Sequence, residues 1–120
     1  MGNPSDIQDY HAHVYFDANT RDEAQRVRDA VDEHFDVRMG RWHEKMVEPH
    51  PCWSYQIGFD PPVLDALVPW LMINRERLTV FLHPNTGDDL ADHIDHVGWL
   101  GPSANLNIDF FEKRAKADGA

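Results

Sequence analysis

The chain has little cysteine, no long apolar run and little positive charge. Its 120 residues include one cysteine, Cys52, so no disulfide can form within the chain. No apolar stretch approaches the length of a bilayer-spanning helix, and the N-terminus lacks the apolar run of a signal peptide. Only 11 basic residues oppose 21 acidic ones, and the net charge of −10 argues against nucleic acid or an anionic membrane as the main partner. These absences favour a cytoplasmic globular protein.

The length fits a single domain spanning residues 1–120, with an ordered core over about 8–112. Such a domain is large enough for a hydrophobic core without disulfides or structural metals. Residues 1–7 and 113–120 carry no apolar pattern, and we expect loose or frayed ends there.

The hydrophobic pattern alternates between strand-like and helix-like segments. Alternation predicts strands at residues 9–16, 36–46, 53–59 and 77–83. Pro84 is expected to end the last of these strands, because proline has no amide proton to donate to a sheet.

Helical spacing predicts one helix after each of the first and third strands. The first runs from a capping box at Thr20–Glu23 to about His34, and the second starts with Asp60 as N-cap and runs to about Asn74. A further short helix over residues 86–96 and a short strand or docking segment over 97–100 follow.

This β-α-β-β-α-β order predicts an α+β sandwich of the ferredoxin-like kind. Both helices lie on one face of an antiparallel sheet, the first and third strands are central, and the fourth lies beside the first. The other face carries Phe81 and needs a cover, which the C-terminal third or a second subunit can supply. We therefore expect a homodimer in which two sheets form a dimeric α+β barrel.

Two histidines in the first strand indicate half of a metal site. His11 and His13 are two residues apart, so both point to one face of the sheet, while Ala12, Val14 and Phe16 point to the helices. The predicted strand order brings His83 to the same face. Imidazole suits Fe, Zn, Cu and Ni.

Other polar residues allow two interpretations each. His93 and His96 are three residues apart on a short helix and can bind a metal together, or can belong to a solvated acidic face. Arg41 can hold a substrate carboxylate or form a surface ion pair. Cys52 lacks the surroundings of a nucleophile motif.

Six segments within residues 9–101 form a serial pattern, namely Tyr10-His11-Ala12-His13-Val14-Tyr15-Phe16, Gly40-Arg41-x-His43, Pro49-His50-Pro51, Trp70-Leu71-x-x-Asn74-Arg75, Leu82-His83-Pro84-x-Thr86-Gly87-Asp88-Asp89-Leu90-x-Asp92-His93 and Trp99-Leu100-Gly101. Together they resemble the DOPA 4,5-dioxygenase family, and the His-Pro-x-Thr-Gly-Asp segment is the most specific of them.

The resemblance implies an extradiol dioxygenase that cleaves a catechol, such as DOPA or another catecholic acid, with Fe(II) and O₂. It points to His11, His13 and His83 as metal ligands. His50 is then a further ligand or a catalytic base, and His93 a base or a group supporting the ligands. Arg41 is a candidate for holding a substrate carboxylate. No carboxylate occupies a strand position that completes a two-histidine, one-carboxylate site, and an all-histidine site also admits Zn or Ni.

Two further functions fit the same fold. One is a non-catalytic ferredoxin-like dimer that binds a metal or small ligand, and the other is an enzyme of a different class, such as a cofactor-free monooxygenase. The density of histidines on one sheet face favours the dioxygenase over the second of these.

Overall fold

The computed structural model describes residues 2–113 and contains the predicted β-α-β-β-α-β order, followed by one more helix and strand. The strands are β1 (Asp9–Phe16), β2 (Arg38–Met39), β3 (Trp53–Phe59), β4 (Thr79–Asn85) and β5 (Gly98–Leu100). The helices are α1 (Arg21–His34), α2 (Leu64–Asn74) and α3 (Asp89–Ile94), with 3₁₀ turns at Pro4–Asp6 and Pro61–Val63.

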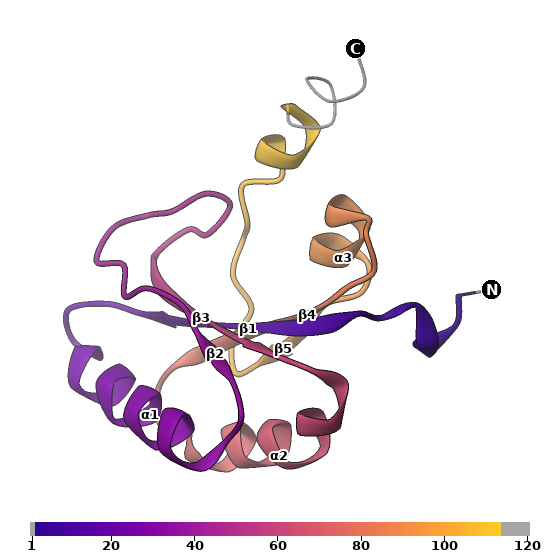
Figure 1. Cartoon of the computed structure of the whole chain (residues 1–120). Coiled ribbons are helices and arrows are strands. Elements are labelled where there is room, and N and C mark those ends of the chain that lie inside the picture. The colour runs from indigo at the N-terminus through magenta and orange to yellow at the C-terminus, as the bar shows by residue number, and fades with distance from the viewer. Residues whose placement is uncertain (1, 114–120) are drawn as a thin grey trace.

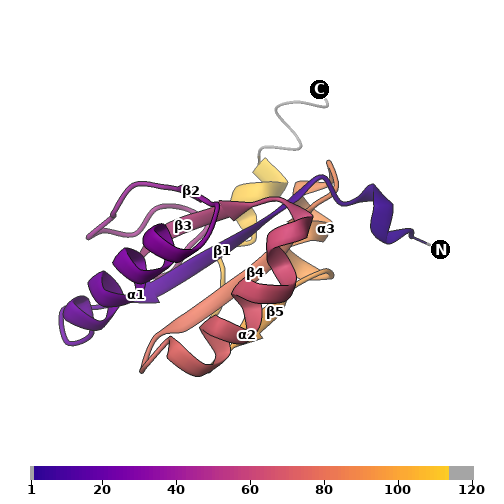
Figure 2. The same cartoon turned by 60° about the horizontal axis from the view of Figure 1, so that its bottom comes forward.

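The five strands form one antiparallel sheet in the order β2-β3-β1-β4-β5. The first and third strands are therefore interior and β4 lies beside β1, which confirms the ferredoxin-like prediction. His11 stands directly opposite His83, and His13 opposite Gln56. Helices α1 and α2 cover one face, whereas the β2–β3 connection, α3 and the C-terminal segment lie over the other (Figure 1; Figure 2).

Alternate side chains of the strands form the core between the sheet and the two helices. Ala12, Val14 and Phe16 of β1 are buried there, as predicted. The helices contribute their apolar stripes, namely Ala24, Val27, Val31, Leu67 and Leu71. Burial of these groups is the main favourable contribution to folding.

The second strand is much shorter than the predicted 36–46. Only Arg38 and Met39 form a strand, and an isolated bridge joins His43 to Ser54. Trp42 packs on Phe16 of the core, while His43 turns to the opposite side. The side chains of this segment therefore do alternate between two sides, as the sequence suggests. They do so in a loop, however, and not in a hydrogen-bonded strand.

Strand β4 runs on through Pro84, contrary to the prediction. Pro84 pairs with Tyr10 of β1, whereas the β5 ladder covers only Val80–Leu82 of β4. At position 84 one side of β4 is therefore a sheet edge. A residue without an amide proton is tolerated there, because no hydrogen bond to a neighbouring strand is lost.

The predicted helix caps are also wrong in detail. The Thr20 hydroxyl donates to Asp17, and the Glu23 carboxylate accepts from the Arg77 backbone at 3.0 Å and from its guanidinium. Asp60 makes no cap bond, because its carboxylate accepts from Arg38. The two carboxylates thus have long-range arginine partners in place of local cap bonds, while Thr20 bonds to Asp17, three residues before it.

The N-terminal segment expected to be loose is partly ordered. The Asn3 side chain accepts from the Ser5 amide, and the Asp6 carboxylate accepts from the Asn3 amide, so a capping box closes the start of the 3₁₀ turn. Of the expected frayed C-terminal end, residues 114–120 lie outside the described residues.

The sheet face opposite the helices is covered within the single chain. Phe81 is fully buried and stacks on Trp99 of β5, with ring centroids 4.7 Å apart, and Phe111 of the C-terminal segment is also buried. The C-terminal third thus supplies the cover, and Phe81 gives no reason for a second subunit. The dimer stays a prediction.

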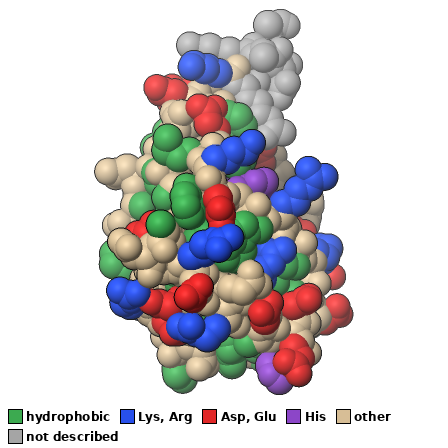
Figure 3. Space-filling view, turned by 90° about the vertical axis from the view of Figure 1, so that its left-hand side faces the viewer, with side chains coloured by type: hydrophobic (Ala, Val, Ile, Leu, Met, Phe, Trp, Pro, Cys, Tyr) green, Lys and Arg blue, Asp and Glu red, His purple; other side chains and the backbone are tan. Residues whose placement is uncertain are grey.

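The exterior is charged and mixed. Acidic and basic side chains are interspersed over the side of the molecule seen in Figure 3. The longest helix among residues 2–113 has 14 residues, and none there combines the length and apolar character needed to span a bilayer.

Candidate metal centre and cavity

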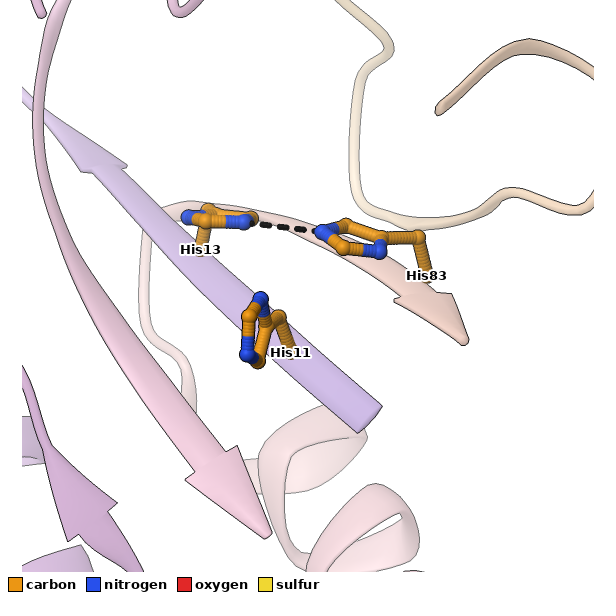
Figure 4. A group of neighbouring side chains, drawn as sticks. All are labelled: His11, His13 and His83. Atoms are coloured by element: carbon orange, nitrogen blue, oxygen red, sulfur yellow. Dashed lines mark hydrogen bonds between the residues drawn. The ribbon is translucent and has the colours of Figure 1, made fainter. Parts of the chain in front are cut away.

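His11, His13 and His83 converge on one side of the sheet, as predicted (Figure 4). Each offers one ring nitrogen, and the three nitrogens lie within 4.8 Å of one another. The pleat places the first two on the same face of β1, and the β1–β4 register adds the third. Two adjacent strands thus hold three nitrogen atoms that can bind one metal ion.

The spacing of two of these nitrogens fits shared coordination of an ion. Nε2 of His13 is 3.0 Å from Nε2 of His83. Imidazole nitrogens bind a zinc ion at about 2.0–2.1 Å, so two of them around one ion are roughly 3.4 Å apart in a tetrahedral site and roughly 2.9 Å apart at right angles, and the observed spacing lies between these values. The histidine set therefore fits a divalent transition metal.

A backbone carbonyl orients His83. Its Nδ1 lies 2.9 Å from the Pro84 oxygen, and because a carbonyl oxygen only accepts, Nδ1 carries the proton. Nε2 of His83 then presents its lone pair toward Nε2 of His13. This is the arrangement that commonly fixes the tautomer of a metal-binding histidine.

Burial keeps the three rings neutral. It lowers the pKa of His13 well below its usual value and that of His83 to about 3, and it also lowers the pKa of His11. The neighbouring histidines add repulsion in the same direction. Neutral imidazole is the form that binds metals, so the site is ready for an ion near neutral pH.

Within residues 2–113, the cluster of metal-ligating groups contains three histidines and no carboxylate. The sequence predicts no carboxylate that completes a two-histidine, one-carboxylate site, and this cluster contains none. An imidazole-only set suits Fe, Zn, Cu and Ni alike.

The cluster opens into a cavity of about 500 Å³, which is within the range of small-molecule sites. His11 and His13 form part of its wall, together with Arg41 and His43 from the loop of residues 40–52. Ser54 and Gln56 of β3 complete that side, and Phe110 and Phe111 of the C-terminal segment lie on another.

His50 lines this cavity and is held by Tyr15. The Tyr15 hydroxyl lies 2.6 Å from Nδ1 of His50, and the His50 ring packs on that of His13 with centroids 4.2 Å apart. Burial lowers the pKa of His50 to about 4 and raises that of Tyr15. Both groups are therefore neutral near pH 7.

His93 lines the same cavity from α3. Its ring lies against His83, with centroids 4.0 Å apart, and against Phe111. Nδ1 of His93 lies 2.7 Å from the Asp89 carbonyl oxygen and donates to it, so Nε2 is the acceptor nitrogen of the ring in its neutral form.

His96 belongs to a different arrangement. Its Nδ1 donates to the buried Asp92, which also accepts from the Thr86 amide and hydroxyl. His96 thus pairs with an acidic side chain of α3, as the second interpretation expects, but that partner, Asp92, is buried and not on a solvated face.

The structure brings all six predicted site residues to one cavity or its wall. Five of them line it directly, and His83 stands behind His13 with its ring against His93. Sequence reasoning gives no role to Tyr15 or His43, although both lie within the motifs of the resemblance. Strand parity indicated Tyr15, since it is two residues beyond His13.

The comparisons with known proteins agree with this geometry. The model of the Dopa 4,5-dioxygenase family matches residues 10–110. A crystal structure from Nostoc punctiforme, described as a candidate dioxygenase, is 46% identical with a TM-score of 0.94, covering 95% of this chain and 99% of that one.

Two curated fungal proteins are also similar. "DOPA 4,5-dioxygenase" of Amanita muscaria is 35% identical over 87% of this chain and 50% of its own length. An uncharacterized 21.2 kDa protein of Botryotinia fuckeliana is 27% identical, with coverages of 87% and 63%. The chain thus spans about half to two thirds of the curated relatives it matches. With the family match extending over most of its length, the chain belongs to the Dopa 4,5-dioxygenase family.

Proposed function

We propose that this protein is an extradiol dioxygenase that cleaves a catechol with Fe(II) and O₂. The observation that carries the proposal is the convergence of His11, His13 and His83 beside a cavity of about 500 Å³. Family membership supports ring cleavage as the reaction. DOPA or another catecholic acid is the substrate class.

The three histidines hold the iron. When bound, Fe(II) supplies the Lewis acidity and the redox chemistry that a reaction between a catechol and O₂ requires. The surrounding rings of Phe81, His93 and Phe111 limit the access of water to this side of the sheet.

Two further histidines move or hold protons. Nε2 of His93 is an acceptor and takes a phenolic proton of the catechol. His50 faces the same cavity with its Nδ1 engaged by Tyr15, so its Nε2 is the atom that meets the substrate.

Arg41 binds the carboxylate of the substrate. It lines the cavity on the loop wall, and a guanidinium can pair with a carboxylate through two parallel hydrogen bonds. This contact distinguishes a catecholic acid from catechol itself.

The experiment is anaerobic loading with Fe(II), addition of DOPA, protocatechuate or catechol, and admission of air. We expect a yellow ring-cleavage product and one iron per chain. His13→Gln and His83→Gln should lose both, whereas His34→Gln, at the exposed end of α1, should keep both.

Stoichiometric iron without product from any catechol would instead support a non-catalytic metal-binding protein. Retention of iron by both cluster variants would show that the site lies elsewhere. A homodimer and a cytoplasmic location are further predictions from the sequence, which light scattering and cell fractionation can check.

A further inference from the structure

The hydroxyl of Tyr15 is buried on the cavity side of β1. Only 5% of the residue is exposed, and the hydrogen bond of its hydroxyl within residues 2–113 is the one to Nδ1 of His50, at 2.6 Å. The ring edge also meets Trp99 and Phe81, which fix its direction.

This contact decides which nitrogen of His50 carries the proton. If Nδ1 of His50 donated, the Tyr15 hydroxyl proton would be buried without an acceptor, which is costly. If Tyr15 donates to Nδ1, both groups are satisfied, and the single proton of the neutral imidazole lies on Nε2.

The surroundings of His50 keep the ring in this orientation. Its backbone amide donates to Val47, its ring packs on His13 and Phe81, and the residue lines the cavity. Tyr15 is not among the residues that line this cavity, and it acts on the cavity through His50.

We propose that Tyr15 is a positioning residue that fixes His50 as a hydrogen-bond donor, with Nε2–H directed at an oxygen atom of the ligand in the cavity. This inference rests on the proposed function for the identity of that ligand, but the tautomer itself is a property of the protein alone.

The proposal separates the roles of two histidines that the sequence cannot distinguish. His93 donates from Nδ1 to a carbonyl and accepts at Nε2, whereas His50 accepts at Nδ1 and donates at Nε2. His50 is thus neither the base nor a metal ligand, because its cavity-facing nitrogen has no lone pair to offer.

The test is long-range ¹H–¹⁵N NMR of the full chain, labelled with ¹⁵N-histidine and freed of metal with a chelator. His50→Gln identifies the His50 signals by their loss. We expect the wild type to show the Nε2–H tautomer of His50, and Tyr15→Phe to convert this signal to a mixture of tautomers.

The matched control is Tyr10→Phe. Tyr10 lies on the same strand but faces the helix side, where it stacks on Phe59. This variant should leave the His50 signal unchanged. An Nδ1–H tautomer in the wild type would overturn the proposal without recourse to any variant, as would an unchanged His50 signal in Tyr15→Phe.

Kinetics on the iron-loaded protein extend the test. In Tyr15→Phe, kcat should fall at least about tenfold, a part of the roughly 10²- to 10³-fold that the loss of one positioned hydrogen-bond donor costs, while KM stays within about twofold. An unchanged kcat in an active enzyme would count against the proposal. If the wild type shows the expected tautomer but cleaves no catechol, the proposed function fails and the assignment of Tyr15 stands.

Discussion

The two faces of strand β1 are buried to a similar degree but contain opposite chemistry. Ala12 and Val14 are fully buried among apolar helix residues, while His13 and Tyr15 are about 5% exposed among other rings. Burial stabilises the fold on the helix side. On the cavity side, burial lowers the pKa of the histidines, and the free-energy cost of burying their polar atoms is offset by a few hydrogen bonds. One strand thus carries both the core and the site, and substitutions on its two faces should have separable effects.

The largest effects should come from separate substitutions of His13 and Val14, which are adjacent in β1 but lie on opposite faces of the sheet. His13→Gln should abolish stoichiometric iron binding, because one of three ligands is lost, with little loss of thermal stability. Val14→Ala should keep the iron but lose roughly 2 kcal/mol of unfolding free energy. Metal analysis and urea unfolding measure the two quantities, and a loss of iron in Val14→Ala would show that the faces are not independent.

A comparison within helix α2 isolates the helix-side core. Leu71 is fully buried and Ile73 is 83% exposed. Leu71→Ala should lower the free energy of unfolding by about 2–5 kcal/mol, and Ile73→Ala should change it by less than about 0.5 kcal/mol. Chemical denaturation checks both, and equal losses would contradict the burial that defines this face.

The cavity side should make stability depend on pH. The pKa of His83 is about 3 in the folded chain and near 6.5 when unfolded. The unfolded state therefore binds more protons below pH 6.5, so this contribution is present above that pH and is lost as the pH falls toward 3.

Metal-free protein should accordingly lose on the order of 2 kcal/mol through His83 between pH 7 and pH 5. Urea unfolding at several pH values measures the slope. His83→Gln should show a shallower slope, and the same slope in both proteins would refute the assignment to this ring.

A smaller effect concerns the loop wall of the cavity. Arg41→Gln should raise KM for protocatechuate or DOPA about tenfold and leave that for catechol unchanged, because only the carboxylate contact is lost. Lys45→Gln, outside the cavity lining, is the control. A parallel rise for catechol would mean that Arg41 acts on the diol or on the fold.

The sequence predicts the parts of the site that depend on strand parity and order. The alternation of β1 places His11 and His13 together, and the fold order brings in His83. Residue types and spacing suffice there, because a pleated strand has only two faces.

The sequence does not predict what depends on the path of irregular chain. The wall formed by Arg41 and His43, and the contact of His50 with Tyr15, follow from a loop whose course is set by tertiary packing. Likewise, Glu23 has a good local cap partner in Thr20, but the Arg77 guanidinium forms a stronger, charge-assisted pair.

The hydrogen bond from His83 to the Pro84 carbonyl bears on how this scaffold can be altered. The acceptor is a main-chain atom, which every amino acid supplies, so no single neighbouring side chain is indispensable for aiming this ligand. The loop wall of the cavity, in contrast, consists of side chains that can be substituted one at a time. Saturation mutagenesis of residues 40–48 is therefore a route to new substrate ranges in which the ion-holding rings keep their alignment.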